Sequence, residues 1–163
     1  SSLPKVYGGF NTSLSWKGFD LSAIFAYSIG GYIYNRDITM ILHNGSLEGR
    51  DWSTEILRRW TPENRYTDVP ALSTTSNNWN SASTRFLQNN SYMRLKNLTL
   101  SYNLPKQLIS KLALSSVQVF VQGDNLFTIH RNQGLDPEQG ITGITYYRYP
   151  AMRTISGGIN LSF

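Results

Sequence analysis

Apolar and polar residues alternate along much of this chain, and the alternation limits what it can fold into. In residues 153–163, Arg153, Ile155, Gly157, Ile159, Leu161 and Phe163 alternate with Thr154, Ser156, Gly158, Asn160 and Ser162. The same period of two runs through residues 6–16, 19–29, 92–102 and 117–127. Successive side chains of a β-strand point to opposite faces, so the pattern predicts five strands with one apolar face each. About ten residues is also the length of strand that crosses a bilayer at a tilt.

Alternation alone fits a soluble β-sandwich equally well, because sandwich strands also have one apolar face. The connections separate the two folds. If neighbouring strands are antiparallel, the Lys17–Gly18 turn and residues 103–116 lie at one end of the sheet, and residues 30–91 and 128–152 lie at the other. Short turns at one end and long loops at the other are typical of outer-membrane β-barrels. A structureless segment as long as 30–91 is uncommon in a compact soluble domain.

The large aromatic residues support the barrel. The apolar faces carry aromatic side chains at the short-turn end of the sheet, namely Trp16, Phe19, Tyr102 and Phe163. A level ring of this kind is expected where a barrel meets the membrane–water interface. The opposite faces are small and polar, with charges only at Asp20 and Asp124, as a wet lumen or a plug contact would tolerate. The sequence therefore predicts an all-β fold, in which antiparallel strands form part of a transmembrane β-barrel with long extracellular loops.

Five strands cannot close such a barrel, because bacterial barrels have at least about eight. An open edge in lipid would leave backbone groups unpaired, at a cost of several kcal/mol each. We therefore expect strands 6–16 and 153–163 to pair with strands outside this sequence. The start, Ser1 to Lys5, resembles no signal peptide, which also suggests that the chain begins within a longer protein.

Composition excludes several classes of protein and site. Charged residues make up 15% of the chain, against about 25% in a typical soluble domain. The absence of cysteine excludes disulfides and thiolate metal sites. The net charge of +5 comes from scattered basic residues, which favours a solvated loop surface over a nucleic-acid site.

Few residues suggest chemistry. His43 and His130 are the only histidines and lie in different segments, so we expect neither a metal site nor a catalytic centre. No G-x-S-x-G nucleophile motif is present. The sequence Asp136-Pro137-Glu138 could offer oxygens to a cation, although a turn with proline at its second position fits it better. The chain is therefore not expected to be an enzyme or to carry a cofactor.

The long segment 30–91 is the best candidate for a binding region. Its candidate contact residues for a ligand or a covering partner are the aromatic residues Trp52, Trp60, Tyr66 and Trp79. The alternative is that these side chains form the small core of the loop itself. We also expect a short helix capped by Asp51 and running to Trp60, and a turn from Pro105 through Leu112.

Several runs of residues resemble one known family along nearly the whole chain. They are Tyr7 to Asn11, Trp60 to Asn64, Thr67 to Pro70, Asn89 to Pro105, Val119 to Thr128, Gly134 to Glu138, Tyr149 to Thr154 and Gly158 to Phe163. In order and spacing, these runs are similar to the carboxy-terminal barrel strands of SusC-type (SusC/RagA family) TonB-dependent outer-membrane transporters.

The resemblance implies functions that belong to a whole protein rather than to this sequence. Such transporters have a barrel of about 22 strands with an amino-terminal plug. They import oligosaccharides or peptides with a SusD-type surface lipoprotein, and energy reaches them through the TonB complex. The resemblance also implies that the barrel lies in outer-membrane lipid, and that the terminal Phe163 is read by the barrel-assembly machinery. Two alternatives remain at this stage, a soluble carbohydrate-binding β-sandwich and a barrel enzyme with a convergent Ser/His pair.

Overall fold

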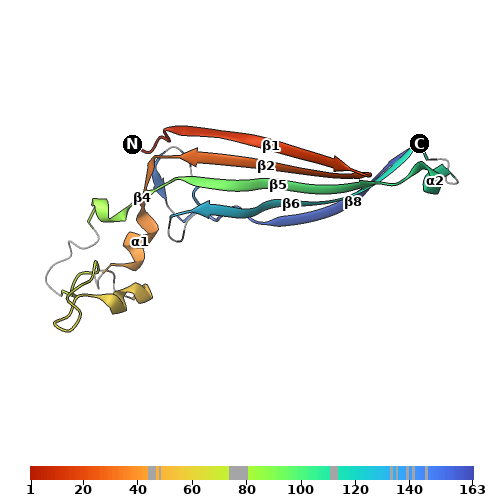
Figure 1. The fold of residues 1–163 in the computed structure, drawn as a ribbon. Helices are drawn as coiled ribbons and strands as arrows, with labels where there is room; N and C mark the ends of the chain where they lie inside the picture. The colour runs from red at the N-terminus through yellow and green to blue at the C-terminus, as the bar shows by residue number, and fades with distance from the viewer. Residues whose placement is uncertain are drawn as a thin grey trace.

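The computed structural model describes residues 1–43, 47, 49–73, 81–110, 114–132, 134, 136–138, 140, 142–145 and 147–163. Five long strands form one antiparallel sheet in the order β1-β2-β5-β6-β8 (Figure 1). Their bounds are Val6–Trp16 for β1, Phe19–Ile29 for β2, Tyr92–Asn103 for β5, Ser116–His130 for β6 and Thr154–Ser162 for β8. Each range in which the sequence alternates therefore lies on one long strand.

The register of the sheet sorts side chains into two faces. One row across all five strands consists of Trp16, Phe19, Tyr102, Val119 and Ile159. The rings of Phe19 and Tyr102 pack with centroids 4.4 Å apart in this row. Along each strand, the apolar side chains of this face alternate with polar side chains, which lie on the other face.

The sheet is a single layer. Apolar side chains on its apolar face stay largely uncovered, with Leu14 66% exposed and Ile155 76% exposed. Among the described residues no second sheet packs against this face (Figure 1). A soluble sandwich needs that second layer, whereas a membrane strand places the same face against lipid.

The two ends of the sheet differ (Figure 1). At one end, Lys17 and Gly18 form a two-residue turn with φ angles of 46° and 88°. Both are left-handed, as the tightest hairpin turns require. The same end holds the carboxy terminus and the short helix α2, Lys106–Ile109, which begins after Pro105. The predicted turn through Leu112 ends outside the described residues.

Polar side chains from two adjacent rows link all five strands on the polar face at this short-turn end. Ser15 Oγ donates to Asp20 at 2.5 Å, and Asn103 Nδ2 donates to the other Asp20 oxygen at 2.7 Å. Gln118 donates to Asn103, and Asn160 donates to Gln118, both at 3.1 Å. We call these five side chains the polar ladder, to which each strand contributes one member.

The sheet is irregular in β5, between its middle and the end where the long loops lie. The pairing of β5 with both β2 and β6 shifts between Leu95 and Asn97, so Lys96 has no opposite partner. On β6, Asn125 has a left-handed φ of 52° at the same level. Such bulges turn side chains away from regular alternation and are frequent beside functional sites.

The segment 30–91 is not structureless. It contains β3 Tyr32–Asn35, α1 Arg36–Ile41, the 3₁₀ helices η1 Thr54–Arg58 and η3 Thr84–Phe86, and β4 Leu87–Asn89. A second, three-stranded sheet has the order β4-β3-β7, in which β7 is Ile144–Thr145. Among the described residues, no helix is both long and apolar enough to span a membrane.

The helix predicted from Asp51 to Trp60 is wrong in its bounds. The helical segment is only η1, and Ser53 caps it by accepting a hydrogen bond from the amide of Glu55. The amide of Ser53 in turn donates to the carbonyl of Ile41 at the end of α1. This tertiary bond places the cap at Ser53 rather than at Asp51.

Candidate functional site in the two long loops

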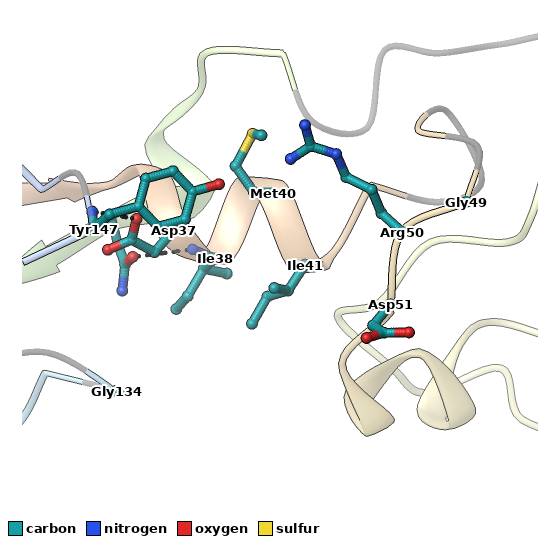
Figure 2. Close-up of a pocket in the computed structure, with 10 residues that line it drawn as sticks. Asp37, Ile38, Met40, Ile41, Gly49, Arg50, Asp51, Gly134 and Tyr147 are labelled. Carbon is teal, nitrogen blue, oxygen red and sulfur yellow. Dashed lines mark hydrogen bonds between the residues drawn. The ribbon is translucent and has the colours of Figure 1, made fainter.

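The two long loops are joined to each other. Strand β3 of segment 30–91 pairs in parallel with β7 of segment 128–152, through Tyr34 opposite Ile144 and Asn35 opposite Thr145. Asn35 and Thr145 are fully buried. The amide of Tyr147 donates to Asp37 at 3.1 Å, a contact drawn in Figure 2. The loops therefore form one structural unit at one end of the sheet.

A cavity of about 460 Å³ lies in this unit, and we call it the loop cavity (Figure 2). Its lining is Asn35, Asp37, Ile38, Met40, Ile41, Gly49, Arg50, Asp51, Gly134 and Tyr147. Helix α1 supplies Asp37 and the aliphatic part of the lining, while Arg50 and Asp51 come from the segment after the helix. The volume falls within the range of about 300–1,000 Å³ that is common for small-ligand sites.

A second feature fixes the loop 128–152 to the sheet, and we call it the charge cluster. It consists of Arg94, Lys96, Asp136 and Glu138. Arg94 is 3% exposed and donates to Asp136 at 2.5 Å, to Glu138 at 2.7 Å and to Thr128 Oγ1 at 2.8 Å. Lys96 Nζ lies 2.6 Å from both oxygens of Glu138. The bulge at Lys96 thus brings two successive cations of β5 toward one loop.

The carboxylate of Asp136 also organises backbone. Its two oxygens accept from the amides of Glu138 at 2.9 Å and Ala151 at 2.6 Å. Burial raises the pKa of the Asp136 carboxyl, but these amide bonds and Arg94 outweigh burial and hold the pKa below its usual value. Asp136 therefore stays ionised at neutral pH and links two parts of the loop, at Glu138 and Ala151, to Arg94 of the sheet.

The residues Asp136 to Glu138 thus have a role that the sequence did not indicate. The turn interpretation fits the Asp136–Glu138 amide bond, and the two carboxylates form ion pairs with Arg94 and Lys96. Arg94 was not singled out beforehand, because its partners lie 42 and 44 residues further along the chain. By the alternation of residues 98–102, Arg94 would fall on the apolar face, so a charge at that position was the available signal that the alternation breaks in β5.

Of the predicted contact aromatics, Trp52, Trp60 and Tyr66 neither line the loop cavity nor belong to the charge cluster. Trp52 packs edge-on against His43, with ring centroids 4.9 Å apart, and remains 39% exposed. Trp60 is 44% exposed, and Tyr66 is completely exposed. Trp79 lies outside the described residues. The buried core of the loop unit is instead built around Phe86, Ile33, Leu42 and Val69.

The two histidines also lie apart. His43 is buried beside Trp52 and accepts from the amide of Leu47, whereas His130 ends β6 opposite Tyr92 and is exposed. Phe163 is 90% exposed at the carboxy terminus. Its side chain therefore makes little contact within this chain.

Comparison with solved structures identifies the fold. The RagAB peptide importer in its "open-open" state matches all of this chain at 35% identity, with a TM-score of 0.88. A structure of the RagAB peptide transporter matches equally completely, at 35% identity and a TM-score of 0.89. The match includes both long loops as well as the five strands, since it covers the whole chain.

Curated sequences agree. TonB-dependent receptor P3 of Formosa agariphila is 34% identical over 98% of this chain, and TonB-dependent receptor P26 of the same organism is 31% identical over all of it. The chain belongs to the TonB-dependent receptors. It is a carboxy-terminal barrel segment of the SusC type. No family model matches the chain.

Membership of this family shows that the strands belong to an outer-membrane barrel. TonB-dependent receptors are outer-membrane β-barrels, so the predicted fold class and location are confirmed. The chain spans 16% and 17% of the two curated relatives and 18% of the importer chain. The open sheet is accordingly one arc of a larger barrel.

Proposed function

We propose that this receptor segment belongs to an importer that takes up oligosaccharides or peptides across the outer membrane. In this proposal, energy arrives through the TonB complex, and a SusD-type surface lipoprotein covers the extracellular mouth. The observation that carries it is the 35% identity to the RagAB peptide importer over every residue of this chain. The role is transport rather than catalysis, in keeping with relatives that are named receptors and importers.

The physical properties of the segment support this role. Its apolar face suits lipid, and its polar face suits a hydrated interior. The long loops lie at the end that faces outward in outer-membrane barrels, and the short turns lie at the periplasmic end. Loops joined into one unit present a stable surface, and the exposed Trp60 and Tyr66 offer rings to a lipoprotein or to a sugar.

Uptake in whole cells tests the transport proposal. The strain that encodes the full-length receptor is compared with a strain that lacks it, using a fluorescent oligopeptide and a fluorescent oligosaccharide. We expect uptake of at least one probe to require the receptor and to stop when a protonophore removes the proton-motive force. Passive uptake that persists with the protonophore would contradict an energised importer.

The lipoprotein is tested separately. Because Tyr66 is exposed and the sequence has no cysteine, Tyr66→Cys offers a site for a cross-linker in the loop unit. We expect a cross-link to a surface lipoprotein of the SusD type, identified by mass spectrometry. A cysteine at Lys17, in the turn at the opposite end, is the matched control and should give no such product.

A further inference from the structure

A second cavity lies where β6 continues past its neighbour, and we call it the rim cavity. Pairing between β6 and β8 ends at Asp124 opposite Thr154. Beyond that point, the edge of β6 lies beside the returning loop, and Asn125 Nδ2 donates to the carbonyl of Met152 at 3.2 Å. The rim cavity has a volume of about 370 Å³ and lies between these segments. Its charged or titratable lining residues are Arg94, His130, Asp136, Arg148 and Arg153.

The negative charge beside the rim cavity is already compensated. One oxygen of Asp136 accepts from Arg94 and from the amide of Glu138, and the other accepts from the amide of Ala151. The oxygens of Glu138 accept from Arg94 and Lys96. Two cations thus face two anions, and the charge cluster is neutral as a whole.

Two further cations have no such compensation. Arg148 and Arg153 both line the rim cavity, and both are exposed. Neither forms an ion pair with any residue that the structure describes. Arg148 also lines an adjoining cavity of about 260 Å³ together with Arg94, Glu138 and Tyr149. The rim cavity therefore carries an excess of positive charge.

We propose that the rim cavity is a subsite for an anionic group of the imported substrate, a proposal that rests on the transport function above. The guanidinium groups of Arg148 and Arg153 bind the anion, and the charge cluster holds the loop that carries Arg148. A guanidinium presents a planar fork of donors that matches a carboxylate with two parallel hydrogen bonds. The substrate class is thus an acidic oligomer, either an oligosaccharide with uronate groups or a peptide with acidic side chains.

The position of Arg148 favours a substrate over a lipid phosphate. Arg148 and Arg94 both line the cavity that adjoins the rim cavity. The side chain of Arg94 donates to Thr128 on the polar face of the sheet. That face is turned away from lipid in an outer-membrane barrel. A ligand held between Arg148 and the charge cluster therefore lies on the substrate side.

Binding to the purified full-length receptor tests the proposal with matched probes. One pair is a tetramer of galacturonate and the corresponding neutral tetramer of galactose. The other pair is a glutamate-containing pentapeptide and the same peptide with glutamine. We expect the wild type to prefer the acidic member of at least one pair, and the pair identifies the source of the carboxylate.

The variants separate charge from structure. The double variant Arg148→Gln/Arg153→Gln should weaken binding of the acidic probe about tenfold or more, equivalent to about 1.4 kcal/mol, and change the neutral probe less than about twofold. Arg148→Lys keeps the charge without the fork and should give an intermediate loss. Arg131→Gln removes an arginine that does not line the rim cavity and is the matched control.

Three outcomes would overturn the subsite. The first is that the wild type prefers neither acidic probe. The second is that the double variant loses affinity equally for the acidic and the neutral probes. The third is that the double variant binds substrate unchanged but loses co-purified lipopolysaccharide. The last result would assign the arginines to lipid phosphate. Energised uptake of a neutral probe by wild type and double variant alike would leave the transport function intact while removing the anion subsite.

Discussion

The backbone amide of Tyr147 donates to the carboxylate of Asp37 across 110 positions of sequence, at 3.1 Å. This bond lies next to the parallel pairing of β3 with β7, so movement of one long loop has to involve the other. The loop 128–152 is in turn tied to the sheet by Arg94 and Asp136. Any substrate or lipoprotein that contacts either loop therefore acts on a unit anchored in the barrel wall.

Arg94→Met should loosen this unit. The substitution leaves Asp136 and Glu138 without their buried cation, and removal of one partner of a buried pair costs about 3–5 kcal/mol. Lys96→Met is the matched control, because Lys96 is partly exposed and such pairs contribute about 0–1 kcal/mol. Hydrogen exchange of the full-length receptor measures the free energy of local opening at β7. Equal protection in both variants would contradict the anchoring role of Arg94.

The anchor should tolerate mild acid. The folded-state pKa of Asp136 is depressed, so its stabilisation is present above the ordinary aspartate pKa of about 3.9 and is lost as pH falls through the lower folded-state value. A spin label at Tyr149, which is exposed, reports the mobility of the loop by electron paramagnetic resonance. Its spectrum should stay unchanged from about pH 8 to about pH 5. In Asp136→Asn the label should be mobile throughout, and pH-dependent mobility in the wild type over this range would refute the assignment.

Charge on the apolar face should be penalised according to depth. Ile155 lies in the row of Leu98 and Ala23, near the middle of the strands. Ile155→Arg should cost about 2–4 kcal/mol, whereas Ile159→Arg, in the row of Trp16 and Phe19, should cost about 0–1 kcal/mol. Folding of the full-length receptor into vesicles, titrated with urea, measures both. Ser156→Arg on the polar face is the control, and a cost there equal to that of Ile155→Arg would reverse the assignment of the faces.

Phe163 should act in assembly rather than in the folded barrel. Its side chain is 90% exposed in this chain, so few contacts are lost when it is replaced. Phe163→Asp should lower the amount of correctly inserted receptor several-fold, and Phe163→Tyr should restore it. The amount is measured by heat-modifiable mobility of outer-membrane fractions. Wild-type insertion of the aspartate variant would remove this role.

Replacing Tyr66 and replacing Trp52 with alanine should have different effects on loop stability and on lipoprotein binding. Tyr66 makes no packing contact that covers it, so Tyr66→Ala should leave loop stability unchanged and weaken binding of the lipoprotein about tenfold if the ring is an anchor. Trp52→Ala removes the ring packed on His43 and should cost about 0.5–1.5 kcal/mol of loop stability. Titration with purified lipoprotein and hydrogen exchange separate the two effects. Unchanged lipoprotein affinity in Tyr66→Ala would exclude it from the interface.

The strands could be predicted from the sequence because their signal is local. A period of two is visible within each strand, and the Lys17–Gly18 turn lies between two such runs. The bulge at Lys96 could not be predicted, because it depends on which residues of β2 and β6 lie opposite. The short β3 and β7 lack a readable period, since β7 has two residues and its partner lies about 110 positions away.

The candidate site was only partly predictable for the same reason. The loop aromatics stand out in composition, and their contact role stays a prediction. Arg94 and Asp136 belong to motifs that resemble the family, yet their pairing depends on how the loop folds back. The helix expected from Asp51 was misplaced because the bond from Ser53 to Ile41 is a tertiary contact.

The polar ladder has a consequence for how the barrel is built. Ser15, Asp20, Asn103, Gln118 and Asn160 can join only when every strand has its native register. A slip of one residue at any interface would put an apolar side chain into the ladder, because side chains alternate between faces. The amides on either side would then lose their partners. The ladder therefore favours the native register, since a strand that pairs out of register loses its side-chain hydrogen bonds to the neighbouring strand.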